Sequence, residues 1–204
     1  MEMQDFEKRS LVGLEKRANE DPMVVEGYAA VFNSWSNDLG GFIERIDPKA
    51  FDGVLGKRDV RALMDHNWEK VLGRESAGTL ELSVDERGLK YRIQLPETTL
   101  GRDLSVLIAR GDIQENSFAF TVGNDEWREG AEGVYERTIT QVDNLFEVSI
   151  VSLPAYNDAK IAARKLDSIK EEAQAKLEAA KQETEERNNM LEEYSNYVES
   201  LKSK

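Results

Sequence analysis

The chain has 204 residues, enough for one domain with a substantial core and an appendage, and its formal net charge of −13 argues against a nucleic-acid binder. It contains no cysteine and a single histidine, which excludes disulfides and cysteine nucleophiles and disfavours a zinc site, so we expect chemistry without a metal or cofactor. No segment approaches the roughly 20 apolar residues of a membrane-spanning helix, and the charged first 20 residues do not resemble a secretory signal, which favours the cytoplasm.

The first 23 residues carry many charges, and we expect them to form an arm or a first edge strand. Alternating apolar and polar residues then predict strands at 24–32, 43–46, 60–66 and 71–74. Gly27, inside the first of these strands, indicates a bulge or a close backbone approach. Pro48 can begin a short helix through Phe51, because proline suits the first helical turn.

The middle of the chain predicts a hairpin followed by a helix. Residues 79–84 and 89–95 alternate in polarity on either side of a turn. The helix is expected to begin at Thr98 or Thr99, either of which can cap it, and to end at Gly111.

Beyond this helix, Ser117 begins a further predicted strand, 117–122. Phe118 and Phe120 share one face of that strand, and Ser117 and Ala119 share the other. A hydroxyl at the edge of a rigid sheet suits a nucleophile, although most serines near strand ends satisfy local hydrogen bonds.

Two more strands are predicted at 134–142 and 144–151, after a charged connection at 127–133. In the last strand Glu147 shares a face with Ser149. Many strands at hairpin spacing with one or two helices between them predict a β-rich barrel or sandwich with peripheral helices.

Residues 165–204 contain neither proline nor glycine, and their apolar positions recur at steps of three and four, which predicts one long helix. Thr184 and Arg187 lie in the middle of its apolar seam, so the isolated helix would be marginal and a partner helix is implied. Two interpretations stay open. The segment is a charged solvated helix, or it is a coiled-coil handle for self-association or for docking to another protein.

The single histidine, His66, constrains any serine chemistry. A serine hydroxyl needs a base to remove its proton during attack, and histidine is the usual base. Ser117 would therefore have to use His66, whose ring needs an orienting carboxylate or carbonyl. Glu147 is one candidate, and Asp65 is a second, although strand parity directs Asp65 to the opposite face. Each of these residues, taken alone, also has an ordinary structural interpretation.

Eight separated motifs within residues 24–164 resemble the prohead maturation proteases of tailed bacteriophages with the HK97-type capsid. They are Val25–Phe32, Gly41–Phe51, Ala62–His66, Val71–Arg74, Gly78–Leu80, Arg110–Ile113, Ser117–Phe120 and Glu147–Tyr156. Around the serine, that family usually has a small residue or Met before it and Gly two residues after it, where this chain has Asn116 and Ala119. Asn116 either supplies a donor near the oxyanion or replaces an apolar neighbour.

The resemblance implies a serine endopeptidase whose fold is similar to that of the herpesvirus assembly proteases, mainly β with peripheral helices and a closed β-barrel. It implies His66 as the general base, Ser117 as the nucleophile and Glu147 as the residue that orients His66. It also implies action inside the assembling procapsid, in the host cytoplasm, on the scaffolding portion of the major capsid protein and on the protease itself. Neither a nucleic acid nor a membrane is an expected partner. The expected domains are an arm at 1–23, the protease at 24–164 and the helical tail at 165–204.

Two other functions compete with this one. A protease-like assembly protein with a decayed serine site is favoured by Asn116 and Ala119, and opposed by the presence of all three candidate catalytic residues. A serine esterase is disfavoured, because the chain has no Gly-x-Ser-x-Gly elbow. The tail has two candidate roles of its own: it recruits the protease by pairing with helices of the capsid scaffold, or it is a segment removed by self-cleavage.

Overall fold

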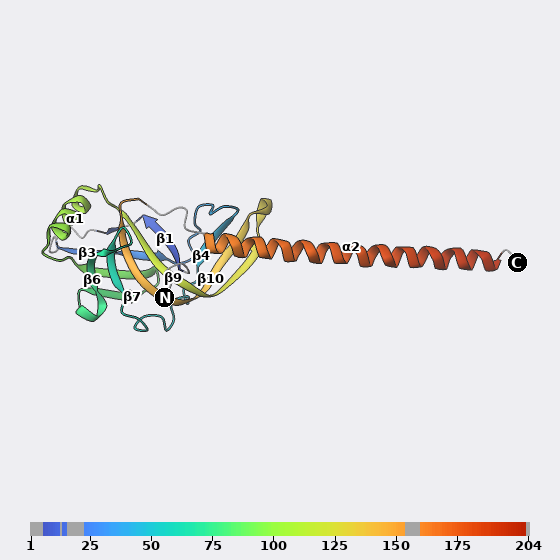
Figure 1. Cartoon of the computed structure of the whole chain (residues 1–204), viewed down its shortest axis with the longest axis horizontal. Coiled ribbons are helices and arrows are strands. Elements are labelled where there is room, and N and C mark those ends of the chain that lie inside the picture. Colours follow the sequence, from blue (N-terminus) through green and yellow to red (C-terminus); the bar gives the residue numbers. More distant parts are fainter. Residues whose placement is uncertain (1–5, 13, 16–22, 154–159, 203–204) are drawn as a thin grey trace. The chain divides into compact units, whose positions relative to one another are not determined.

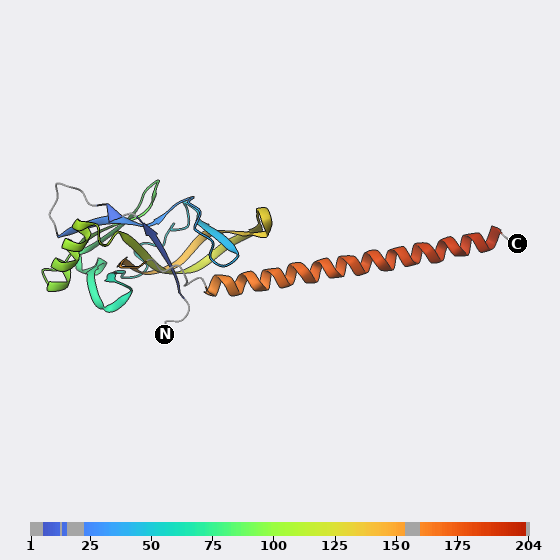
Figure 2. The same ribbon diagram turned by 90° about the horizontal axis from the view of Figure 1, so that it is seen from above.

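The computed structural model describes residues 6–12, 14–15, 23–153 and 160–202 (Figure 1). The chain divides into two compact units, Met1–Ile161 and Ala162–Lys204. The first unit holds all the described strands, and two views of it at right angles show the strands wrapped around a shared interior (Figures 1 and 2).

The larger sheet of the first unit has six strands in the order β1-β9-β10-β5-β6, with β4 paired to β10 as well. Its strands are β1 (Glu7–Val12), β4 (Phe42–Ile46), β5 (Arg61–Met64), β6 (Asn67–Arg74), β9 (Glu115–Glu129) and β10 (Tyr135–Val151). Strand β10 is 17 residues long, so its first part can pair with β4 and its last part with β5, both in parallel.

The smaller sheet has four strands in the order β2-β3-β8-β7. Its strands are β2 (Leu14–Glu15), β3 (Val24–Val31), β7 (Leu80–Val84) and β8 (Gly88–Gln94). Helix α1 (Thr99–Arg110) and the short 3-10 helices η1 (Glu75–Ala77) and η2 (Ala131–Gly133) complete the unit. The core joins both sheets, because Phe118 and Phe120 of β9 belong to one buried cluster with Leu89, Tyr91 and Ile93 of β8.

The closed β-barrel expected from the resemblance is wrong. In the part of the chain that the structure describes, the larger sheet ends at β1 and β6, and the smaller sheet ends at β2 and β7, without pairing of the terminal strands. Alternation of polar and apolar residues predicts half-buried strands, but this pattern is the same for a barrel and for two facing sheets. What holds is the composition of the fold, which is mainly β with two α-helices.

Helix α1 confirms the predicted helix and both of its ends. The Thr98 side chain accepts a hydrogen bond from the Gly101 backbone N–H at 3.3 Å, and Gly111 closes the helix in the left-handed region with φ of 81°. The prediction for Gly27 is also confirmed, because a Cβ at this position would lie 2.6 Å from the Tyr91 hydroxyl oxygen.

Two local predictions are wrong. Residues 48–55 form successive turns instead of a short helix, because their backbone hydrogen bonds join residues three apart, such as Ala50 N–H to Asp47 and Val54 N–H to Phe51. The strands predicted at 134–142 and 144–151 form the single strand β10, and β9 continues into the first three residues of the predicted connection. Irregularities in the β9–β10 pairing explain why one strand was predicted as two. They interrupt the alternation of polar and apolar residues, while the two strands stay hydrogen-bonded to each other.

Helix α2 (Lys160–Lys202) confirms the predicted long helix, and from Ala162 onward it forms the described part of the second unit. Its apolar residues Leu177 and Met190 are 56% and 69% exposed. Among the described residues, no helix is both long and apolar enough to cross a membrane.

Candidate active site

His66 lies in a two-residue turn between β5 and β6. Sequence parity placed it at the end of the strand, but the strand ends at Met64, and both Asp65 and His66 adopt left-handed backbone angles, with φ of 52° and 56°. Such angles in two consecutive non-glycine residues cost about 1–2 kcal/mol each and persist only where neighbouring contacts enforce them. The turn directs the imidazole back over the sheet.

Asp65 anchors this turn to the end of β10. Its backbone N–H donates to the carbonyl of Ile150 at 3.0 Å. Its Oδ1 accepts from the backbone N–H of Ser152 at 2.8 Å and from the Ser152 hydroxyl at 2.9 Å. The Asp65 carboxylate therefore binds Ser152, and no hydrogen bond joins it to the imidazole in the described part of the chain.

Glu147 is the carboxylate that contacts the histidine. His66 Nδ1 lies 2.6 Å from Glu147 Oε1, and the glutamate is only 1% exposed. In the tautomer in which Nδ1 donates this hydrogen bond to an ionised carboxylate, Nε2 is the acceptor of the ring. This is the protonation pattern that a general base requires.

Ser149 contacts both His66 and Glu147. The sequence did not identify it as a site residue. Its hydroxyl donates to Glu147 Oε2 at 2.5 Å and accepts from the His66 backbone N–H at 3.2 Å. The available signal was the shared face of Glu147 and Ser149, two residues apart on one strand. One hydroxyl thereby positions both the carboxylate and the turn.

Ser117 lies on the next strand. It is directly opposite Ser149 in the β9–β10 pair, and Ser149 is opposite Leu63 in the β10–β5 pair, so all three side chains share one face of the sheet. Ser117 is completely buried. Neither Ser117 Oγ nor His66 Nε2 has a hydrogen-bond partner among the described residues. The structure therefore joins His66 to Glu147, places Ser117 one strand away, and leaves unpaired the two atoms between which a proton would pass.

Asn116 faces the other way, into the core. It accepts a hydrogen bond from the Tyr91 hydroxyl, and its Nδ2 has no partner among the described residues. Burial raises the pKa of Tyr91, so this phenol remains a neutral donor. The Asn116 side chain is thus on the face opposite to Ser117, which fits replacement of an apolar core residue better than an oxyanion donor.

Comparison with known protein families identifies the family of this chain. The model of the caudovirus prohead serine protease family matches residues 12–172. The chain belongs to this family. The match includes His66, Ser117 and Glu147, and membership supports a capsid maturation protease role, with action in the procapsid and interaction with the capsid protein in general. Searches of curated proteins and of solved structures each found no match.

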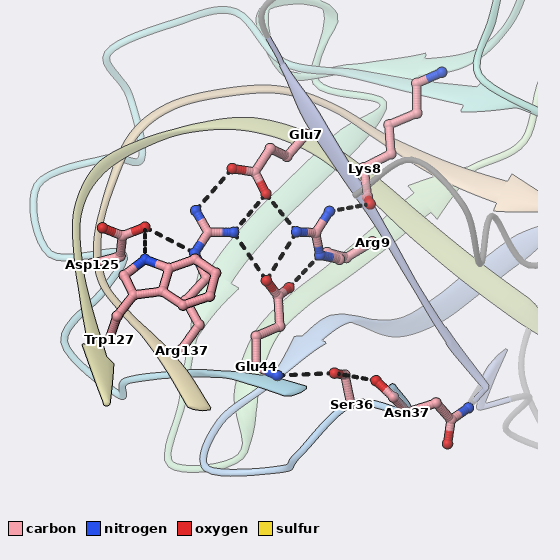
Figure 3. A network of polar contacts seen from close by, with 9 residues as sticks. All are labelled: Glu7, Lys8, Arg9, Ser36, Asn37, Glu44, Asp125, Trp127 and Arg137. Atoms are coloured by element: carbon pink, nitrogen blue, oxygen red, sulfur yellow. Dashed lines mark hydrogen bonds and ion pairs between the residues drawn. The ribbon is translucent and has the colours of Figure 1, made fainter. Parts of the chain in front are cut away.

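This member of the family also contains a buried charged cluster that the sequence did not predict (Figure 3). The cluster consists of Glu7 and Arg9 of β1, Glu44 of β4, Asp125 of β9 and Arg137 of β10. Arg137 binds Glu7 at 2.8 and 2.9 Å, Glu44 at 3.0 Å and Asp125 at 2.8 Å. Arg9 binds Glu7 at 2.5 Å and forms a bidentate pair with Glu44. Four strands of the larger sheet are joined by these contacts.

The contacts within the cluster favour the charged forms of Glu7, Arg9 and Arg137. Burial alone would raise the pKa of Glu7, but hydrogen bonds and the positive charges of Arg137 and Arg9 outweigh it and lower the pKa below its usual value. Burial likewise opposes the charge of Arg137, and its three carboxylate partners raise its pKa. The indole of Trp127 covers the cluster, with its ring centroid 5.4 Å from the Arg137 guanidinium.

No group of three or more His, Asp or Glu side chains within the described ranges is arranged to hold a metal ion.

Replacing Ser149 with alanine is expected to lower kcat/KM about 10- to 100-fold while Ser117, His66 and Glu147 all remain. The change removes a donor from a buried carboxylate, which costs about 1–3 kcal/mol, and each 1.36 kcal/mol in the barrier is about tenfold in rate. Cleavage of the capsid protein measures the loss, and Ser149→Thr, which keeps the hydroxyl, should recover most of it. Ser149 positions the base, so we expect the pH profile of kcat/KM to change. A lower melting temperature with an unchanged profile would assign Ser149 a purely structural role.

Proposed function

We propose that this chain is the prohead maturation endopeptidase that cleaves the scaffolding portion of the major capsid protein and also cleaves itself. Ser117 acts as the nucleophile, His66 as the general base and Glu147 as the residue that orients His66. The observation that carries the proposal is the 2.6 Å contact between His66 Nδ1 and Glu147 Oε1, which leaves Nε2 as the free base on the face shared with Ser117.

The reaction follows from this arrangement. Ser117 Oγ attacks the carbonyl carbon of the scissile bond as its proton passes to His66 Nε2, and the carbonyl oxygen becomes an oxyanion. Glu147 stabilises the imidazolium that forms. The imidazolium then protonates the leaving amine as the C–N bond breaks, which leaves an acyl-enzyme. Water attacks the ester with His66 again as the base, and the returned proton restores the Ser117 hydroxyl.

In this proposal residues 24–164 perform the cleavage inside the procapsid, in the host cytoplasm. The direct test is co-expression of the capsid protein with the intact chain and with Ser117→Ala, followed by measurement of the capsid protein's mass. Processing by the intact chain alone supports the peptidase. Equal processing by both chains removes Ser117 from the mechanism and favours the decayed, protease-like assembly protein.

The tail helix has a separate proposed role. We propose that residues 165–204 recruit the protease into the procapsid by pairing with helical segments of the capsid scaffold or with a second copy of the tail. The supporting observation is a long helix whose apolar residues Leu177 and Met190 are exposed. A chain that ends at Arg164 is expected to be packaged several-fold less than the full chain, as measured by quantitative immunoblotting of purified procapsids. Equal packaging would contradict recruitment. Mass spectrometry of mature particles distinguishes the rival role, because an intact tail excludes its removal by self-cleavage.

A further inference from the structure

We propose that the edge of β9 beside Ser117 is the docking edge for an extended polypeptide substrate, and that β1 of the same chain occupies this edge in the substrate's place. The proposal rests on the proposed function, because a peptidase needs a substrate chain next to its nucleophile. It adds that β1 must leave before substrate can bind.

The pairing of β1 with β9 is the first support. Six consecutive pairs join the two strands in antiparallel register without a shift, from Glu7 opposite Phe120 to Val12 opposite Glu115. Ser10 is directly opposite Ser117 in this register. Antiparallel addition to a sheet edge is a general mode of binding extended peptides. A substrate that pairs with this part of β9 would have to take the position of Ser10.

The burial of the reactive atoms is the second support. Ser117 is 0% exposed, and Ser117 Oγ and His66 Nε2 are both buried without a hydrogen-bond partner among the described residues. A polar atom that is buried and unpaired is costly, and functional sites are where such atoms occur. A substrate carbonyl cannot reach a fully buried Ser117, so this conformation is a closed one.

The way in which β1 is held is the third support. Two of its charged side chains, Glu7 and Arg9, lie largely buried, at 3% and 11% side-chain exposure. Arg9 binds Glu44 and Arg137 binds Glu7 within the charged cluster, as Figure 3 shows. A buried ion-pair network gains little net stability compared with apolar packing, and it loses much when one member is removed. The attachment of β1 therefore includes a network of ion pairs that is weakened as a whole when one member is lost.

A cleft also lies beside β1, and neither Ser117 nor His66 is among its lining residues. It is lined by Arg9 and Ser10 of β1 together with Ala29, Trp35, Arg45 and Phe118. Departure of β1 would widen this cleft, since two of these side chains belong to β1.

A reversible disulfide tests the proposal in the full chain. Val12 and Glu115 are opposite each other in the register, where Cα atoms lie about 4.5–5.5 Å apart, a separation that a disulfide can span. Because the natural chain has no cysteine, Val12→Cys with Glu115→Cys can form only one intramolecular bond. The readouts are cleavage of the capsid protein and the rate at which a fluorophosphonate labels Ser117, located by peptide mass spectrometry.

We expect the oxidised form to be labelled and to cleave about tenfold more slowly, or slower still, and reduction to restore both rates. Equal rates in the oxidised and reduced forms would overturn the proposal. Failure of the disulfide to form would also overturn it, because β1 would then not lie on β9.

Arg9→Met provides the opposite perturbation. It keeps an aliphatic stem near Phe120 but removes the charge that binds Glu7 and Glu44, so we expect labelling and cleavage to become several-fold faster. Arg58→Ala is the matched control, because Arg58 is exposed and donates to Asn144 outside the charged cluster. Slower cleavage by Arg9→Met with a lower melting temperature would show that β1 only supports the fold. The proposed function fails separately, if Ser117 is not labelled and capsid protein is not cleaved in any of these forms.

Discussion

Replacing Ser117 with alanine is expected to abolish capsid protein processing, with a loss of roughly 10⁴- to 10⁶-fold in kcat. Alanine has no oxygen that can form the acyl-enzyme, so His66 and Glu147 have no nucleophile to activate. The loss of a nucleophile removes the whole covalent route, and changes elsewhere in the site cannot compensate for it. The processed fraction of capsid protein after co-expression measures the effect.

The same substitution should leave the fold intact or make it more stable. The Ser117 hydroxyl is buried without a partner in the described structure, and burial of an unpaired hydroxyl costs about 1–3 kcal/mol in protein mutational data. We therefore expect the melting temperature of Ser117→Ala to equal or exceed that of the natural chain. Loss of activity together with a higher melting temperature would show that the Ser117 hydroxyl serves the reaction and destabilises the fold.

Ser83→Ala is the matched control, because Ser83 is an exposed serine on β7 of the smaller sheet. This variant should process the capsid protein at the natural rate. If Ser117→Ala also retained natural processing, Ser117 would not be the nucleophile. If it lost activity together with several degrees of melting temperature, a folding defect would explain the loss as well as the chemistry does.

Replacing Glu147 with glutamine is expected to lower kcat by about 10³- to 10⁴-fold. Glutamine has nearly the same shape but no charge, so it does not stabilise the imidazolium that forms when His66 takes the Ser117 proton. Its amide also has to be accommodated between His66 Nδ1 and the Ser149 hydroxyl, both of which donate to the natural carboxylate. Single-turnover cleavage and the rate of fluorophosphonate labelling at Ser117 both measure this loss.

Asp65→Asn tests the alternative orienter. Because the Asp65 carboxylate accepts from Ser152 and anchors the turn, its loss should have a smaller effect, of about tenfold. Near-natural rates in Glu147→Gln together with a large loss in Asp65→Asn would reverse the assignment of the two carboxylates.

Local sequence patterns predicted those features that depend on neighbouring residues. The alternation around Ser117 placed Phe118 and Phe120 on one face of a strand, which the structure buries in the core, and the capping residues Thr98 and Gly111 correctly bounded α1. Proline-free and glycine-free spacing predicted the helix that the structure shows as α2. Such features follow from side-chain periodicity and from the hydrogen-bonding needs of helix ends, which are encoded within a few residues.

The motifs around the candidate catalytic residues carried the family resemblance, and the family match bears it out. They could not give the position of His66, because a histidine that ends a strand and one that occupies the following turn have the same sequence neighbours. The left-handed backbone of His66 depends on Asp65 binding Ser152, and those two residues are 87 positions apart.

The tertiary structure alone decided how the strands associate. Period-two alternation is shared by barrels and by facing sheets, so it could not exclude the closed barrel, and bulges that keep β10 continuous have no clear local signal. The charged cluster is the extreme case: Glu7 and Arg137 are 130 positions apart and each resembles an ordinary surface charge in the sequence. Local sequence preferences determine turns, helix ends and which side chains share one face of a strand. Strand partners and buried ion pairs depend instead on contacts between segments that are distant in the sequence.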